Sequence, residues 1–353
     1  MRVCNELHTR PLTHFDDRAN DADGLDDRAN GAIGARDARS WPTLVAAGAV
    51  LGAFLTGACH PPVKSTLPGP PTAADLAQLW IDAPAGRDLF WGVGGKPLAP
   101  DPAASYTVIE IKRTGFSQGY TLRGPDRREW SAKFPPEAST EVVASRIHWA
   151  VGYHQPPIYY VQKWHAEKAT LPNPQLPARF REKDPPLGGG LEDTGTWSYY
   201  QNPFVGTREL KGLIVLQAML GNSDLKDDNN TMYALSKPLE GARIWYVARD
   251  LGHTFGRTGV VDAPRGDVDI FEETPFIKGV ANGRVMLDWR GRHDVLFEDI
   301  TPADVRWICG RLQRLRDAQW RDAFRAGGYP PVDAERFIRR LKQKIAEGLA
   351  LKG

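Results

Sequence analysis

The chain has 353 residues, of which 41% are hydrophobic, and this length is enough to bury the core of one or two domains. Its formal net charge is +2 and its charged residues are mixed in sign, so the composition gives no sign of a nucleic-acid-binding protein. The three cysteines, Cys4, Cys59 and Cys309, have neither the spacing of a disulfide scaffold nor that of a zinc site.

Residues 1–43 are expected to be a disordered N-terminal extension. They are polar and rich in Asp, Arg, Gly and Ala, and they contain the sequence Asp-Asp-Arg-Ala-Asn twice. Such a stretch cannot bury enough apolar surface to offset the entropy that a chain loses on folding.

Residues 44–59 are typical of a secretion signal. The run from Leu44 to Ala58 is uncharged and is shorter than the about 20 residues of a membrane-spanning helix. Its ending, L-T-G-A-C with Cys59 last, resembles a bacterial lipoprotein signal; a plain signal peptide and a buried hydrophobic helix are the alternatives. We therefore expect export to the cell envelope, with membrane attachment through this N-terminal lipid or signal segment.

The Pro-rich residues 60–72 are expected to be a linker, and the folded part to begin near Ala73. Within residues 73–164, alternating apolar and polar residues predict antiparallel strands at 106–111, 120–122 and 129–134. The turn between the first two strands contains glycines, including Gly115 and Gly119, and the third strand carries Lys133. This order resembles the small lobe of a kinase, in which glycines let the backbone approach the phosphates of ATP and a lysine holds the α- and β-phosphates.

A helix is expected over residues 139–151, where Val143, Ile147 and Val151 form one apolar stripe. Glu141 is the candidate to pair with Lys133, and Glu137 is the alternative. A third interpretation is that Glu141 only favours the N-terminus of the helix by its charge.

Residues 165–353 are expected to form a second, mainly helical lobe. Its first part, 166–209, is rich in Pro and Gly; we expect little regular structure there and a position between the lobes, where it would shape the site of the phosphate acceptor. Residues 210–220 are apolar nearly all round, which predicts a buried helix.

The sequence G-N-S-D-L-K-D-D-N-N follows this helix and places Asp224 five residues before Asn229. A predicted strand at 244–247 then leads to Asp250. Phosphoryl transfer from ATP requires a carboxylate that orients the attacking hydroxyl, with an amide and a second carboxylate on the metal ion. A solvated acidic turn is the alternative, because Asp and Asn favour turns. Asp227, Asp228 and Asn230 are also close enough to be mistaken for the site residues.

This loop resembles the catalytic loop of HipA-type and phosphatidylinositol-kinase-like enzymes, and D-L-G-H-T-F-G from Asp250 is similar to the D-F-G-H-x-x-G metal loop of lipid kinases. The resemblance covers roughly residues 106–256. It implies a two-lobed α+β fold of the protein-kinase-like superfamily, with ATP and Mg²⁺ between the lobes. It also implies that Asp224 is catalytic, that Asn229 and Asp250 are magnesium ligands and that Lys133 binds ATP, with a hydroxyl compound of unknown class as acceptor.

Two features depart from that pattern. No His or Arg flanks Asp224; Leu225 and Lys226 stand there instead, and Lys226 is expected to help neutralise the transferring phosphate. The glycine loop contains few glycines. The alternative function is therefore that of an inactive pseudokinase, an exported binding or scaffold module of the cell envelope.

The C-terminal residues predict three helices, at 302–315, 317–325 and 333–350. The last has Phe337, Leu341, Ile345 and Leu349 at every fourth position, with five basic residues around them. This pattern is typical either of a solvated face on a packed helix or of a contact with anionic lipid headgroups. Cys309, in the first of these helices, is expected to be a small buried hydrophobic residue.

Overall fold

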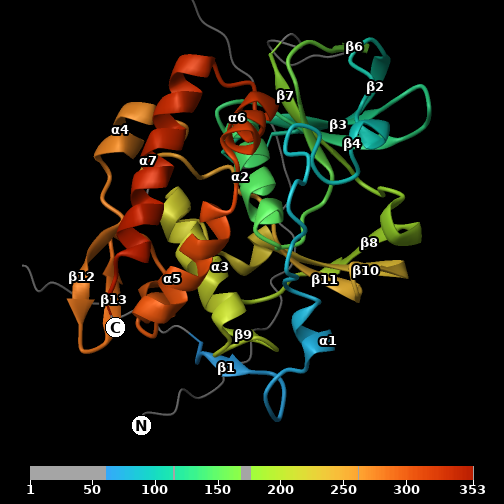
Figure 1. Cartoon of the computed structure of the whole chain (residues 1–353). Helices are drawn as coiled ribbons and strands as arrows, with labels where there is room; N and C mark the ends of the chain where they lie inside the picture. The colour runs from blue at the N-terminus through green and yellow to red at the C-terminus, as the bar shows by residue number, and fades with distance from the viewer. Residues whose placement is uncertain (1–60, 114–115, 168–175, 261, 353) are drawn as a thin grey trace, which may run out of the picture. The chain divides into compact units, whose positions relative to one another are not determined.

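The computed structural model describes residues 61–113, 116–167, 176–260 and 262–352, which form an α+β protein (Figure 1). The strands are β1 (Lys64–Ser65), β2 (Ser105–Lys112), β3 (Gly119–Arg123), β4 (Glu129–Lys133), β5 (Ile158–Val161), β6 (His165–Glu167), β7 (Ala178–Glu182), β8 (Leu191–Gly195), β9 (Gln201–Asn202), β10 (Asn230–Leu239), β11 (Ala242–Ala248), β12 (Ile277–Ala281) and β13 (Arg284–Leu287). The α-helices are α1 (Ala73–Leu76), α2 (Glu137–Ala150), α3 (Arg208–Leu220), α4 (Val268–Glu273), α5 (Pro302–Gln313), α6 (Asp317–Ala326) and α7 (Pro331–Leu349).

The largest sheet has the strand order β5-β7-β4-β3-β2-β6. Its pairs are antiparallel except for β2 with β6, and the predicted meander of β2, β3 and β4 is confirmed. Alternate residues of these strands bury aromatic side chains in one cluster, which includes Tyr120, Trp130 and Phe180. In the register of β3 with β4, Gly119 lies opposite Lys133.

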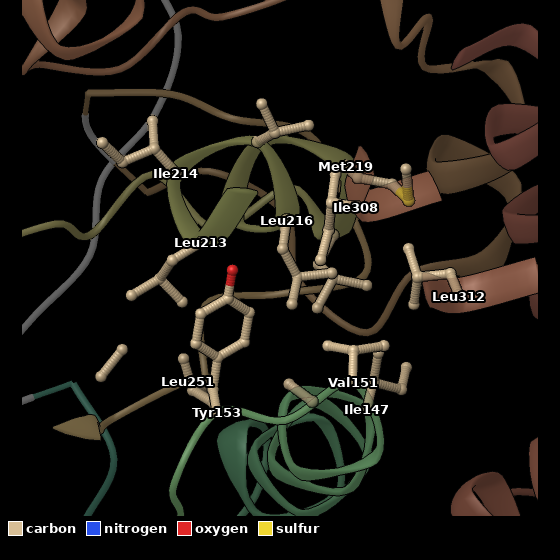
Figure 2. Close-up of a cluster of buried hydrophobic side chains, with 14 of the residues drawn as sticks. Ile147, Val151, Tyr153, Leu213, Ile214, Leu216, Met219, Leu251, Ile308 and Leu312 are labelled. Carbon is tan, nitrogen blue, oxygen red and sulfur yellow. The ribbon is translucent and has the colours of Figure 1, made fainter. Parts of the chain in front are cut away.

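Helix α2 lies against β5 and β7 of this sheet and against α6. Its other apolar side chains join the main hydrophobic core, where Ile147 and Val151 meet side chains of α3 and α5 (Figure 2). The predicted helix α3 is buried on nearly every side. Tyr153 follows α2 and donates a hydrogen bond from its hydroxyl to the carbonyl oxygen of Glu209, at 2.7 Å, which ties the end of α2 to the start of α3.

The last helix, α7, packs against α4, α5 and α6; Phe337, Leu341 and Ile345 of its predicted apolar stripe are buried and Leu349 is half-buried. Its basic side chains mostly pair with acids of neighbouring elements: Arg336 contacts Asp269 and Glu272, and Lys342 contacts Asp317 at 2.7 Å. These ion pairs agree with the interpretation of α7 as a packed helix with a solvated basic face. Cys309 of α5 is fully buried, as expected.

The N-terminal boundary of the fold differs from the prediction. Strand β1 lies within residues 60–72, which were expected to be a linker, and it pairs in parallel with β9. The amide of Lys64 donates to the carbonyl of Tyr200 at 2.8 Å, so the folded part begins before Ala73. The sequence did not predict this strand because only two of its residues pair and the segment around it is rich in proline.

The prediction of little regular structure in residues 166–209 is wrong. Strand β7 lies inside the largest sheet, between β5 and β4, and β8 pairs with β10 in a second sheet of order β11-β10-β8. A lobe boundary between residues 164 and 165 would therefore cut through one sheet. The strands were missed because each is short and is flanked by Pro and Gly.

The predictions for residues 1–43 and 44–59 lie outside the described residues. Within the described part of the chain, no helix is both long and apolar enough to span a membrane.

Candidate functional site

Six of the eight predicted site residues line one cleft of about 360 Å³. They are Gly119, Lys133, Asp224, Lys226, Asn229 and Asp250. Glu141 lies behind Lys133 and contacts it, whereas Gly115 is outside the described residues. The cleft is also lined by Lys112, Arg179 and Arg181, so basic side chains outnumber the acidic ones of Glu137, Asp224 and Asp250.

Lys133 ends β4 and forms the centre of the contacts in the cleft. Its Nζ contacts Oδ1 of Asp250, and it lies 3.2 Å from Oε2 of Glu141 and 3.4 Å from Oε2 of Glu137. Both glutamates that the sequence left as alternatives are therefore within ion-pair distance. Burial by itself lowers the pKa of Lys133, but Glu141 and the other carboxylates raise it above the usual range, so the ammonium stays charged.

Glu141 is buried, and a second layer of charges holds it. Its Oε1 lies 3.1 Å from Nε of Arg179 and 3.5 Å from Nη1 of Arg181, both on β7. Burial raises the pKa of Glu141, but Arg179 and then Lys133 lower it by more, so the carboxylate is ionised. Arg179 in turn donates from Nη1 to the carbonyl of Ser131 on β4, at 3.0 Å.

Sequence reasoning missed both arginines of β7. The residues Arg179, Phe180 and Arg181 do alternate between basic and apolar, which is a strand signal. It was overlooked because the surrounding Pro and Gly residues indicated a loop.

The loop after α3 begins at Gly221, which adopts φ +78° and ends the helix as a left-handed C-cap. Asn222 then donates to the side chain of Gln217 at 3.0 Å and accepts from the amide of Asp224 at 3.1 Å. Leu225 is buried in the main core. These contacts fix the backbone of the loop where the side chain of Asp224 faces the cleft.

Two further hydrogen bonds join this loop to the end of β11. Asn229 donates from Nδ2 to the carbonyl of Asp224 at 2.9 Å, and its own carbonyl accepts from the amide of Arg249 at 2.9 Å. Asp250 follows with φ +58°, a left-handed conformation that Asp tolerates better than most residues. Asn229 and Asp250 are thereby brought to the same cleft from segments far apart in the sequence.

Asp224 lies partly exposed beside Lys226, with Oδ1 2.9 Å from Nζ of the lysine. Burial raises the pKa of Asp224, but hydrogen bonds from Lys226 and Asn229 lower it by more, so it is a carboxylate near neutral pH.

The donor atoms fit a magnesium ion shared with phosphates. Magnesium is usually held by one or two carboxylates together with phosphate oxygens and water. The Nδ2 of Asn229 is already a donor to Asp224, so its Oδ1 is the atom that faces a cation, next to the Asp250 carboxylate. No group of three or more His, Cys, Asp and Glu side chains in the described residues would hold a metal ion unaided.

A larger cavity of about 840 Å³ lies elsewhere, lined by aromatic residues such as Trp91, Tyr159 and Tyr160. Among the described residues, Asp101 is the only acid that lines this cavity, and none of the predicted site residues lines it. A metal–phosphate group needs several oxygen ligands, so the smaller polar cleft is the better candidate.

The sequence matches no protein-family model and no curated protein. Among solved structures, the chain is similar to the proinflammatory kinase CtkA of Helicobacter pylori, with 12% identity and a TM-score of 0.42 over 69% of this chain and 96% of that chain. A match at this level assigns neither a family nor an activity to the chain.

Proposed function

We propose that the chain is an atypical kinase-like phosphotransferase that transfers the γ-phosphate of ATP to a hydroxyl acceptor. The observation that carries the proposal is the convergence of Lys133, Asp224, Asn229 and Asp250 on one cleft from separate parts of the sequence. In this proposal the sheet of β2 to β7 with α2 belongs to a small lobe, and α3 to α7 belong to a large one.

Lys133 would bind the α- and β-phosphates of ATP, with Glu141 fixing the position of its side chain. Without nucleotide, Lys133 contacts Asp250. When phosphates enter, the lysine exchanges this carboxylate for phosphate oxygens, and the Asp250 carboxylate becomes available to a cation. Arg179 and Arg181 compensate the buried charge of Glu141 in either state.

Asn229 and Asp250 would hold the magnesium ion, which when bound neutralises charge on the phosphates. Asp224 orients the acceptor hydroxyl and accepts its proton, and Lys226 neutralises charge on the transferring group. Most of the acceleration in such a reaction comes from positioning and charge stabilisation, which this set of groups supplies.

The expected location of this activity is the cell envelope, with the chain exported and attached through its N-terminal segment. Since ATP is scarce outside the cell, a catalytically inactive module that uses the same cleft for binding is the second candidate. The inactive module is favoured by one departure from the kinase-like pattern, the absence of a His or Arg next to Asp224.

Calorimetric titration with ATP and magnesium tests the binding part of the proposal. We expect saturable binding to the unmodified chain and loss of the magnesium-dependent part in Asp250→Asn. The matched control is Asp228→Asn, which changes an exposed acid of the same loop that does not line the cleft. At a ligand concentration of a hundred times Kd, binding should stabilise the fold by about 2.7 kcal/mol.

Transfer of labelled γ-phosphate to an envelope extract tests the chemistry. Asp224→Asn should bind ATP as the unmodified chain does but lose transfer. Binding of ATP without transfer in the unmodified chain, or no binding of ATP at all, would refute the phosphotransferase and favour the inactive binding or scaffold module.

A further inference from the structure

A second depression, of about 460 Å³, lies beside the cleft and shares Phe116, Glu137, Asp224 and Lys226 with it. Asp224 and Lys226 therefore border two neighbouring spaces. If ATP occupies the cleft, as proposed above, the space on the other side of Asp224 is where an acceptor hydroxyl must approach.

The rest of the lining of this depression combines basic and imidazole side chains with three uncharged residues. The basic and imidazole side chains are His253, Arg265, Arg292 and His293, and the uncharged residues are Ser223, Gly259 and Val260. The two acids in the lining are already paired with cations, Glu137 with Arg265 at 2.5 Å and Asp224 with Lys226 at 2.9 Å. Its walls therefore carry an excess of positive charge.

Arg265 and Arg292 differ in how they are held. The side chain of Arg265 is only 7% exposed, pairs with Glu137 and lies over the ring of Phe116 at 3.6 Å, so it is fixed in place. Arg292 is exposed, and within the described residues its guanidinium forms no ion pair. Its donors are thus available to a ligand.

His253 adds a polar group close to Asp224. Its Nε2 is buried and has no hydrogen-bond partner in the part of the chain that the structure describes. Burial and the charge of Arg265 lower the pKa of His253, although Asp224 raises it, so the imidazole is neutral near pH 7. A neutral imidazole can donate a hydrogen bond to a hydroxyl of the acceptor or accept one from it.

We propose that the acceptor is a small alcohol that also carries an anionic group, a phosphate or a carboxylate, which Arg292 and Arg265 bind while its hydroxyl faces Asp224. This inference rests on the proposed function. In the transfer, the acceptor oxygen forms a bond to the γ-phosphorus, the bond from that phosphorus to the β,γ-bridging oxygen breaks, ADP leaves, and the hydroxyl proton passes to Asp224.

The test is a two-step titration of the full chain. A non-hydrolysable ATP analogue with magnesium is added first, to fill the cleft, and glycerol 3-phosphate is added second, with glycerol as the uncharged probe. We expect saturable binding of glycerol 3-phosphate and none of glycerol. Because an exposed arginine that hydrogen-bonds an anion contributes about tenfold in affinity, Arg292→Gln should weaken the second step about tenfold.

The control is Arg290→Gln, an exposed arginine two residues away that does not line the depression. A failed first step refutes the proposed function. A normal first step followed by no second step, by equal binding of glycerol, or by equal losses in Arg290→Gln and Arg292→Gln, overturns the anionic acceptor alone. Vesicles of phosphatidylglycerol replace glycerol 3-phosphate in a parallel arm. Binding of the vesicles without binding of glycerol 3-phosphate overturns the small acceptor and identifies a lipid headgroup as the ligand instead.

Discussion

Replacement of Glu141 by Gln tests the charge network behind the cleft. The change removes one negative charge and keeps the shape of the side chain. It leaves Lys133, Arg179 and Arg181 facing a neutral amide, with Arg179 almost fully buried. Breaking a buried ion pair costs about 3–5 kcal/mol, and since Gln retains some hydrogen bonding we expect a loss of about 3 kcal/mol at pH 7.

The free energy of unfolding is measured by urea denaturation, with an unchanged slope and a lower midpoint expected. In a thermal scan the same loss lowers Tm by roughly 6–12 °C. The control is Glu129→Gln, which removes a half-exposed glutamate of the same sheet that pairs with Arg123 at 2.7 Å and, being screened by solvent, is expected to cost much less. Equal losses of unfolding free energy in Glu141→Gln and Glu129→Gln would refute the stabilising role of the ion pairs around Glu141.

The pH dependence of the free energy of unfolding gives a second test of the Glu141 ion pairs. The pKa of Glu141 is lower in the folded chain than its ordinary value of 4.5, so the folded state binds fewer protons there than the unfolded state. The stability that the carboxylate contributes is therefore complete above about pH 5 and is lost as the pH falls through the lowered pKa. The difference in free energy of unfolding between the unmodified chain and Glu141→Gln should stay constant above about pH 5 and shrink below it.

Two further outcomes are expected. Burial lowers the pKa of His148 from 6.5 to about 4, so between these pH values the unfolded state binds more protons than the folded state. The free energy of unfolding should therefore fall by on the order of 3 kcal/mol from pH 7 to pH 4. Urea denaturation at each pH measures this slope, and His148→Gln should remove it. A slope unchanged in the variant would assign it to other groups. A methyl at Gly119 would overlap the carbonyl oxygen of Ala132, so Gly119→Ala should separate β3 from β4 and weaken ATP binding in calorimetry. The control is Gly69→Ala, at an exposed position with open space and no positive φ, which should leave ATP binding unchanged. Equal ATP affinity in both glycine variants would contradict the close approach.

Local sequence patterns predicted the elements that carry the site. The strand ending at Lys133, the helix with Glu141 and the buried helix before Asp224 each have a clear periodicity and lie where expected. Their boundaries are signalled by residues with a physical role, such as Gly221 at the end of α3.

The missed features depend on contacts between distant segments. Nothing near Arg179 in the sequence indicates that β7 inserts between β4 and β5, where the arginine meets Glu141. The grouping of His253, Arg265 and Arg292 around one depression likewise arises from folding of the loops, and these residues share no spacing that a motif would reveal.

The most direct test is a crystal structure with a non-hydrolysable ATP analogue and Mn²⁺, located by its anomalous scattering. We predict an anomalous peak between Asn229 and Asp250, with Lys133 on the phosphates and no longer on Asp250. A nucleotide bound instead in the aromatic cavity beside Trp91, or a metal peak away from Asp250, would contradict the proposed phosphotransferase.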